Sequence, residues 1–565
     1  MNMARGRFTG QRLLKSVQRE PRSVLLYRRA ALVAVVVGGV AGETEGQAEI
    51  HVGHSLGTVE FRVSCSVQAQ AEFDRAVALL HHMTYPLAQE AFQRVAAIDS
   101  RCAMAHWGVA MTLFHPLWPT RPGLDERQRG WDAVQRAKAL GLPTARERLF
   151  VAAAEAFFKE PASSDYWLRI RRWEEAMQQA YASFPDDDEM ATFYALAHLA
   201  TTPSDSISRA HADRAAEVLL HVYRGNSDHP GAMHYLVHAN DVPGRERQLL
   251  EITHKYESLA PGNPHALHMP THIYVRLGDW DGVIRGNRLA AEAALAHPAG
   301  DRGELVWDEF PHAIEYLVYA YLQQGADDWA SAQVERLLGT GRLQPTFKTA
   351  FHLASTRARY ALEREAWDEA ARIVPREPAA LAWDQFFWPE AVAQFARGLG
   401  AAHLGKIDEA RAAAVRLEQL LAATVDAGEV LFARNIRILH LELNGWLAHI
   451  DGQRERSVAL MQEAAEIEVS TPKHAVTPGP TLPAYELLGA LLMEQQQPAA
   501  ALAAYTRSLD LYPRRFTGLL GAARAARALG NDPVARKFYQ ELLDVGVGGQ
   551  RQPALMEARD YLGRR

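Results

Sequence analysis

A pair of histidines that recurs after 34 residues constrains the fold of this chain more than any other feature. The pattern H-x-x-x-H occurs as His234/His238 and again as His268/His272, and a proline precedes each copy at the same offset, Pro230 and Pro264. Two histidines four positions apart lie on one face of an α-helix, with Cβ atoms about 5–6 Å apart. A fixed period of this length is typical of helix-turn-helix repeats. The pattern therefore predicts two histidine pairs at the same height on successive helices of an α-solenoid.

The composition agrees with a helical-repeat protein. The chain has 565 residues, more than one ordinary domain, but a repeat array escapes that limit because each repeat packs only on its neighbours. Ala, Leu, Arg and Glu, which favour helices, are abundant. The formal net charge of -6 includes no basic surplus that would indicate nucleic-acid binding. The sequence also lacks the glycine patterns of nucleotide-binding loops and serine hydrolases, which argues against those activities.

The first 48 residues have the pattern of an export signal. Residues 1–29 are basic and are followed by an apolar run, Ala30–Ala41, which is too short for a comfortable transmembrane span. We expect cleavage after Ala41 or Ala48 and a periplasmic protein. The alternative is an uncleaved inner-membrane anchor with the repeats facing the periplasm.

The two cysteines, Cys65 and Cys102, leave a disulfide open. Cys65 lies just before the first expected helix and Cys102 just after the first helical pair, so contact is geometrically plausible. An oxidising compartment would allow one bridge between them. The alternative, which we weigh equally, is a pair of inert buried thiols.

Beyond the signal, periodicity divides the chain into four segments. Residues 49–66 form an extended lead-in, 67–470 a helical array, 471–483 a Pro-rich loop and 484–565 further helical repeats. Loops of this kind are often functional. Lys473 and His474 are therefore candidates to close over a groove as part of a lid, and the alternative is a connector that spans a kink between repeats.

The last two repeats resemble the tetratricopeptide repeat (TPR) superfamily. The matching positions are Tyr485, Leu488, Gly489, Leu492, Ala501, Tyr505, Ser508 and Pro513, then Leu519, Ala522, Ala523, Ala526, Ala535, Tyr539 and Leu542. The resemblance implies a right-handed α-solenoid over most of residues 67–563. It also implies a concave groove, lined by the first helix of each repeat, that binds a protein, a peptide or a small ligand.

Four further segments resemble large exported bacterial TPR proteins that have no established activity. They are Ser64–Ser66 (SCS), Cys102–Gly108 (CAMAHWG), His268–Tyr274 (HMPTHIY) after the first histidine pair, and Lys473–Pro480 (KHAVTPGP). This resemblance implies architecture and no chemistry.

The four paired histidines are candidate metal ligands. Neutral imidazole binds Zn, Cu, Ni or Fe, and a catalytic site needs about three protein ligands and an open position. Neither pair has the glutamate of H-E-x-x-H, so a metalloprotease is unsupported. The side chains that we expect nearby, as further ligands or as partners of the ligands, are Asp241, His265, Tyr274, His312, Glu315, Tyr194 and His198.

Proline inside the second histidine pair strengthens the metal hypothesis. A proline in a helix interior costs about 3 kcal/mol, and Pro270 lies between His268 and His272. The protein could tolerate that cost if Pro270 orients the imidazoles of His268 and His272 toward a ligand. The alternative is a packing role copied by duplication. The neighbouring His81 and His82 end the first expected helix, and we place them at the solvent.

Two functions remain open on these grounds. The favoured one is an exported scaffold whose groove holds a protein, peptide or small ligand without a cofactor. The other is a metal-dependent enzyme or metal-binding protein with Zn, Cu, Fe or Mn held by the four histidines. We expect no nucleic-acid partner, and membrane contact only through an uncleaved N-terminal segment.

Overall fold

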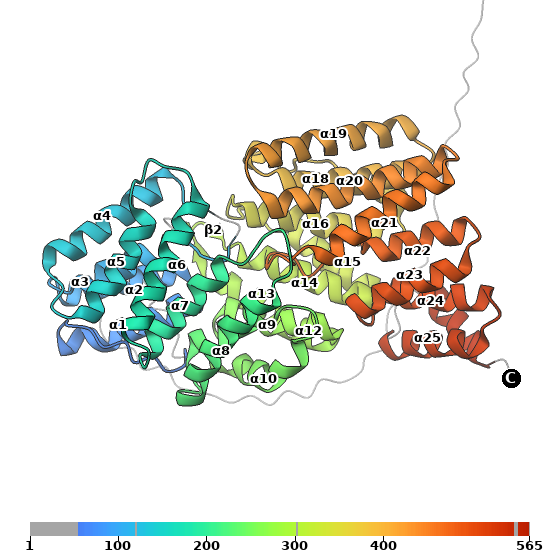
Figure 1. The fold of residues 1–565 in the computed structure, drawn as a ribbon. Coiled ribbons are helices and arrows are strands. Elements are labelled where there is room, and N and C mark those ends of the chain that lie inside the picture. The colour runs from blue at the N-terminus through green and yellow to red at the C-terminus, as the bar shows by residue number, and fades with distance from the viewer. Residues whose placement is uncertain (1–54, 119–120, 301–302, 547–551, 564–565) are drawn as a thin grey trace, which may run out of the picture. The chain divides into compact units, whose positions relative to one another are not determined.

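Helices provide nearly all the regular structure of the chain. A computed structural model describes residues 55–118, 121–300, 303–546 and 552–563 (Figure 1). The predicted signal, residues 1–48, and the start of the lead-in lie outside the described residues. Within the described part, no helix combines the length and apolarity that crossing a bilayer requires. The predicted all-α fold is confirmed.

The helices follow one another with short connections. The first group is α1 (Val67–His81), α2 (Tyr85–Ile98), α3 (Ala103–Met111), α4 (Leu124–Leu140), α5 (Ala145–Phe158), α6 (Tyr166–Ser183), α7 (Asp188–Ala200) and α8 (Arg209–Gly225). The middle group is α9 (Pro230–Asn240), α10 (Leu250–Leu259), α11 (Pro264–His268), α12 (Pro270–Leu277), α13 (Trp280–Ala296), α14 (Glu309–Gln323), α15 (Asp327–Gly339), α16 (Phe347–Leu362) and α17 (Trp367–Ala371). The last group is α18 (Phe387–His403), α19 (Ile407–Asp426), α20 (Val430–Ile450), α21 (Arg454–Ser470), α22 (Ala484–Glu494), α23 (Pro498–Leu511), α24 (Phe516–Ala528), α25 (Asp532–Val545) and α26 (Gln552–Gly563).

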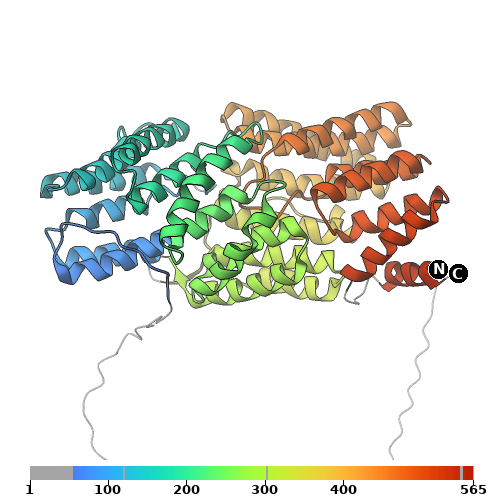
Figure 2. The ribbon, with the colours of Figure 1, turned by 60° about the horizontal axis from the view of Figure 1, so that its bottom comes forward.

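Consecutive helices pack as antiparallel pairs, which stack on the next pair (Figures 1 and 2). Tyr505 of α23 shows how closely they approach. A Cβ at Gly489 of α22 would lie 2.8 Å from its ring, and one at Gly521 of α24 would lie 2.3 Å from it. Only glycine fits at these two crossings, because a side chain would overlap the ring. The predicted TPR-like repeat architecture is confirmed.

A few short elements interrupt the helices. β1 (Pro298–Ala299) and β2 (Leu305–Val306) form a two-residue antiparallel ladder. Two 3-10 turns, Glu246–Leu249 and Trp383–Gln385, lie between helices. The first of these runs directly into α10.

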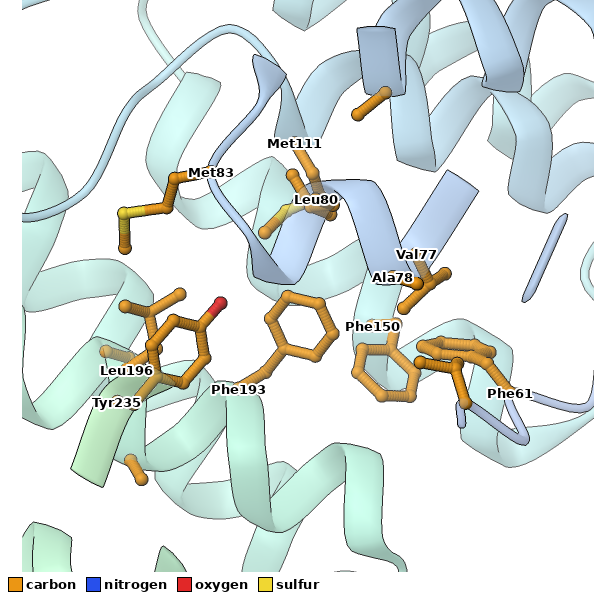
Figure 3. Close-up of a cluster of buried hydrophobic side chains, with 14 of the residues drawn as sticks. Phe61, Val77, Ala78, Leu80, Met83, Met111, Phe150, Phe193, Leu196 and Tyr235 are labelled. Atoms are coloured by element: carbon orange, nitrogen blue, oxygen red, sulfur yellow. The ribbon is translucent and has the colours of Figure 1, made fainter. Parts of the chain in front are cut away.

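The lead-in packs into the first helices through Phe61. Its side chain is fully buried, and its ring centroid lies 4.7 Å from that of Phe150 on α5 (Figure 3). The Phe61 N–H donates to the Asp74 carboxylate (3.0 Å), and the Ser64 N–H donates to that of Glu147 (2.6 Å). These bonds satisfy backbone groups that no strand partner satisfies.

A disulfide joins the lead-in to α3. The sulfurs of Cys65 and Cys102 are bonded at 1.98 Å. Of the two alternatives for the cysteines, the structure contains the bridge.

Pro270 divides the second histidine-pair helix in two. The expectation of one helix through Pro270 was wrong, because α11 ends at His268 and α12 begins at Pro270. Proline has no N–H to donate, so the helical bonding stops there. Met269 keeps helical torsions (φ -54°, ψ -42°), and His268 and His272 therefore still face the same side.

The Pro-rich loop, residues 471–483, is held against the helices rather than extended from them. The Arg359 guanidinium on α16 is fully buried and donates to the carbonyl oxygens of Gly479 (3.1 Å) and Pro480 (2.7 Å). At the start of the loop, Lys473 reaches the Asp241 carboxylate at 2.7 Å. The loop is thus anchored at both ends by buried cations.

Glu468, just before this loop, gives the protein a pH-dependent stability that a substitution tests. Burial raises the pKa of its carboxyl from 4.5 to about 8. Since the folded pKa exceeds the unfolded one, the folded state binds more protons between these values, and the free energy of unfolding falls as the pH rises through them. We expect Glu468→Gln to remove this loss, so that the variant gains at least about 1.4 kcal/mol over the wild type between pH 5 and pH 8.5, the equivalent of one pKa unit. Urea denaturation at both pH values measures it, and parallel pH profiles for the two proteins would contradict it.

Candidate metal centre

The first histidine pair is completed by a third histidine from the next repeat. His234 and His238 lie on α9 and His265 lies on α11. The Nε2 atom of His234 is 3.2 Å from the Nε2 of His238 and 3.2 Å from the Nε2 of His265. Two nitrogens that bind one ion tetrahedrally at about 2.0–2.1 Å lie about 3.3 Å apart. The first trio, His234, His238 and His265, therefore has the spacing of metal ligands.

The second pair is completed in the same way. His268 of α11 and His272 of α12 have Nε2 atoms 2.9 Å apart. His312 of α14 brings its ring centroid within 4.2 Å of that of His268. These three form a second trio whose ligand atoms lie within 4.8 Å of one another.

Hydrogen bonds on the far side of the rings fix which nitrogen faces the centre. The Nδ1–H of His234 donates to the His81 carbonyl oxygen (2.6 Å). The Nδ1–H of His268 donates to the Asn287 side-chain oxygen (2.7 Å), and that of His272 donates to the Asp241 carboxylate (2.9 Å). Each of these acceptors takes a proton from Nδ1, so the lone pair lies on Nε2 in all three rings. Outer partners of this kind are typical of metal-bound histidines.

His312 is oriented through a second histidine. Its Nδ1 lies 2.9 Å from Nε2 of His352 on α16, whose Nδ1 lies 2.6 Å from the Glu315 carboxylate. A carboxylate at the end of the chain makes each ring donate toward it, which leaves Nε2 of His312 free. His265 has a longer contact, 3.5 Å from its Nδ1 to the Glu309 carboxylate.

Burial keeps the imidazoles in the neutral form that binds metals. Desolvation lowers the pKa of His234, His238, His268 and His312 well below the usual 6.5. Desolvation, with the nearby Lys473 ammonium, lowers the pKa of His272 to about 4. Neutral imidazole is the ligand form, so no proton has to leave these five rings when an ion binds at neutral pH.

The carboxylates around the trios are already neutralised. Asp241 pairs with Arg276 (2.8 Å) and Lys473 (2.7 Å), Glu309 and Asp308 pair with Lys348 (2.8 and 3.2 Å), and Glu315 pairs with Arg359 (3.3 Å). Burial raises the pKa of the Asp241 carboxyl, but its two cations lower that pKa by more than burial raises it. The net pKa lies well below its usual range, so the carboxyl stays ionised. Four carboxylates thus face four cations, and the shell adds no net charge to the centre.

A small cavity lies between the two trios. It has an empty volume of about 300 Å³ and is reached by histidines of both, His238 and His265 from the first and His272 and His312 from the second. The rest of its wall is Met83, Leu117, Trp118, Met269, Ala475 and Val476. Figure 3 shows Met83 on the turn that follows α1. Two histidines of each trio therefore line the same small space.

A wider pocket of about 1250 Å³ adjoins this cavity and shares Leu117, Trp118, His238 and Ala475 with it. Its wall carries aromatic side chains and cations, Tyr166, Trp167, Phe432, Arg121, Arg276 and Lys473. Part of this volume is open to solvent. The predicted loop residue His474 also lines it and packs against Trp388 and Phe432, with ring centroids 6.1 and 5.7 Å away.

Three expected site residues lie elsewhere. Tyr194 stacks on Tyr181, with ring centroids 5.2 Å apart, and His198 pairs with Glu174 at 2.8 Å. Tyr274 turns to the opposite side of α12, where its ring lies 5.9 Å from that of His254. Sequence proximity suggested these three, but their helical faces point away from the trios.

The placement of His81 and His82 at the solvent was wrong. Both side chains are fully buried. His81 bonds to Glu189 (2.9 Å), and its carbonyl oxygen accepts from His234. His82 bonds to the Tyr256 hydroxyl at 2.8 Å. α9 covers this end of α1, which a one-dimensional pattern does not reveal.

Sequence reasoning missed several residues that support the trios. They are Asn287, Glu309, Lys348, His352, Arg276 and Met83. His352 lies 40 residues after His312, on a helix of another repeat, and that spacing was a signal for it. The others belong to common residue types at unremarkable positions.

Comparison with known proteins gives no information on the chemistry of the histidine trios. No family model matches the chain, and no curated protein matches it in sequence. Similar solved structures include the APC/C hetero-tetramer Cut9-Hcn1, with 14% identity and a TM-score of 0.32 over 88% of this chain and 89% of that chain. Another is the human IFIT1 dimer with m7Gppp-AAAA, with 12% identity and a TM-score of 0.36 over 87% of this chain and 92% of that chain. These scores are too low to carry an argument about this chain.

Proposed function

We propose that the protein is a metal-dependent enzyme with a centre for two transition-metal ions. His234, His238 and His265 would hold one ion, and His268, His272 and His312 the other. The observation that carries this proposal is the arrangement of six histidines, five of them buried and His238 partly buried, in two trios with Nε2 spacings of 3.2 and 2.9 Å. A packing role explains one buried histidine at a time, but not two equal trios with their ligand nitrogens turned inward.

The open sides of the trios support catalysis rather than a structural role. Structural zinc sites use four protein ligands, whereas catalytic sites use three and leave one position open. Both trios face one cavity, so two ions there would act on the same small molecule. The wider pocket next to it would hold a substrate near His238.

Six neutral nitrogen donors narrow the choice of metal. Imidazole suits Cu, Zn, Fe and Ni, whereas Mn prefers oxygen ligands. Among the described residues, the carboxylates nearest the trios are engaged by cations, which disfavours an oxygen-rich site. Of the metals expected from the sequence, Cu, Zn and Fe are therefore favoured over Mn.

Export is part of the proposal. The basic and apolar pattern of the first 48 residues favours it, and the disulfide between Cys65 and Cys102 is of a kind that persists in oxidising compartments. A helical-repeat fold is also one that serves protein-interaction scaffolds. A peptide ligand is disfavoured here because the chain's own loop, 471–483, already packs against this surface, where it contacts His272 of α12 and Arg359 of α16.

Metal content tests the proposal directly. The protein would be purified from the periplasm without a histidine tag and measured by elemental mass spectrometry. We expect two ions per chain, about one in His234→Ala and in His268→Ala, and none in the double variant. His449→Ala is the matched control, because His449 pairs with Glu494 away from the trios and should leave both ions bound. A folded protein that binds no metal, even after incubation with Cu, Zn, Fe or Mn, would overturn the proposal.

A further inference from the structure

We propose that the cavity between the trios binds dioxygen between two copper(I) ions. This inference rests on the proposed two-metal centre and adds the identity of the metal and of the molecule that meets it. Three observations carry it: the apolar side chains in the wall of the cavity, the charge balance around the trios, and the lining residues that the cavity shares with the wider pocket.

Apart from its four histidines, the wall of the cavity offers a polar molecule almost nothing to bond. Met83, Met269 and Val476 are apolar and buried, and Leu117 and Ala475 complete the apolar side. The Trp118 indole N–H donates to the Met83 sulfur (3.1 Å), so it is not directed at the cavity. Among the described residues that line it, none is a carboxylate, a hydroxyl or a lysine. A hydrolytic centre needs a held water and an acid or base to move its proton. This cavity suits a small apolar molecule instead.

The charges near the cavity are paired with one another. Lys348 lies 3.8 Å from the centroid of the Trp118 ring and pairs with the Glu309 carboxylate. Lys473 bonds the Asp241 carboxylate and the Thr477 carbonyl oxygen, at 2.7 and 3.2 Å, and its ammonium also lies 3.2 Å from Nδ1 of His272. Neither lysine belongs to the lining of the cavity.

The charge balance favours monovalent ions. Two divalent ions would place four positive charges in a buried shell whose carboxylates are already neutralised, and uncompensated buried charge is costly. Two copper(I) ions bring only two positive charges. When dioxygen binds, each copper(I) gives it one electron, which yields two copper(II) ions and a dioxygen unit carrying two negative charges with its O–O bond intact. The total charge stays at plus two, and the step needs no proton and no other reductant.

The wider pocket meets this cavity at four shared lining residues, Leu117, Trp118, His238 and Ala475. An organic substrate in the wider pocket would then meet the activated oxygen at His238. Ala475 lies at this boundary, and a larger side chain there would fill the cavity.

Gas binding to the copper(I) protein tests the inference without any substrate. Metal-free protein would be loaded with copper(I) under anaerobic conditions and its copper counted. Carbon monoxide, followed by its infrared stretch, and dioxygen uptake at an electrode are the two probes. We expect two coppers per chain, a bound carbon monoxide band, and one dioxygen taken up per copper pair.

Variants at the boundary make the test specific. We expect Ala475→Phe to keep two coppers per chain and to lower uptake of both gases at least tenfold, and Val476→Ile, which adds one methylene, to lower it less. Ala97→Phe, at an exposed site on α2, is the matched control and should behave as the wild type. Two bound coppers without uptake of either gas by the wild type would overturn this inference and leave the metal centre standing. A protein that holds no metal would overturn the proposed function itself.

Discussion

Replacing Arg515 with alanine is expected to lower the free energy of unfolding by about 3–5 kcal/mol. Arg515 is fully buried and donates to the carboxylates of Glu486 (2.6 Å) and Glu363 (2.8 Å) and to the Tyr319 hydroxyl (2.9 Å). It therefore joins α14, α22 and the end of α16 to the start of α24. Removing the cation takes the shared partner away from two buried carboxylates, Glu363 and Glu486. This loss lowers the free energy of unfolding more than replacing all three charged groups by neutral ones would.

Urea denaturation followed by circular dichroism measures the effect of Arg515→Ala. Arg524→Ala is the control, because Arg524 is an exposed arginine paired with Glu557 and should cost less than about 1 kcal/mol. The combination of Arg515→Met with Glu363→Gln and Glu486→Gln should recover part of the lost stability, since no unpaired charge then remains. Equal effects of Arg515→Ala and Arg524→Ala would contradict the assignment.

Asp241→Asn is expected to act on stability and on metal binding together. Asp241 accepts from Arg276, Lys473 and His272, and the neutral amide leaves the two buried cations without a counter-charge. We expect a loss of about 3 kcal/mol in the free energy of unfolding. The amide also weakens the bond that orients His272, so we expect the affinity for the second ion to fall by about 10–100-fold.

The two readouts separate the roles of Asp241. Metal titration should show the weakened site in the second trio only, with the ion at His234, His238 and His265 retained. Asp186→Asn, at an exposed turn, is the matched control and should change neither quantity. Full retention of both ions at wild-type affinity would contradict the orienting role, even if stability falls.

The sequence predicted the repeat and the histidine pairs because both follow a fixed period. A helical repeat places equal positions at equal heights, so His234/His238 and His268/His272 were expected together, and His265, His312 and Asp241 were named as neighbours. Tyr194, His198 and Tyr274 were named on the same grounds and lie elsewhere. The difference is the direction of a helical face, which depends on the packing of each helix on its neighbours.

The outer partners could not be read from the sequence for a related reason. Asn287 of α13 accepts from His268, and Lys348 of α16 pairs with Glu309 beside His265, but single asparagines and lysines on helices are usually solvent-exposed. His81 was misplaced because its burial depends on α9, which lies more than 150 residues further along the chain. A period predicts which residues share a height, but not which distant helix covers them.

Because the loop, 471–483, follows all six histidines in the sequence, the proposed centre is completed only when this loop docks. Lys473 meets His272 across 201 residues of sequence, and Ala475 and Val476 supply one wall of the cavity. A chain emerges N-terminus first, whether from the ribosome or from a translocation pore, so the helices with the six histidines emerge and begin to pack before this wall does. In that interval the proposed ions would meet a site that is still open to solvent. Once the loop docks, ions in the proposed sites would be enclosed, and their release would require the loop to leave first.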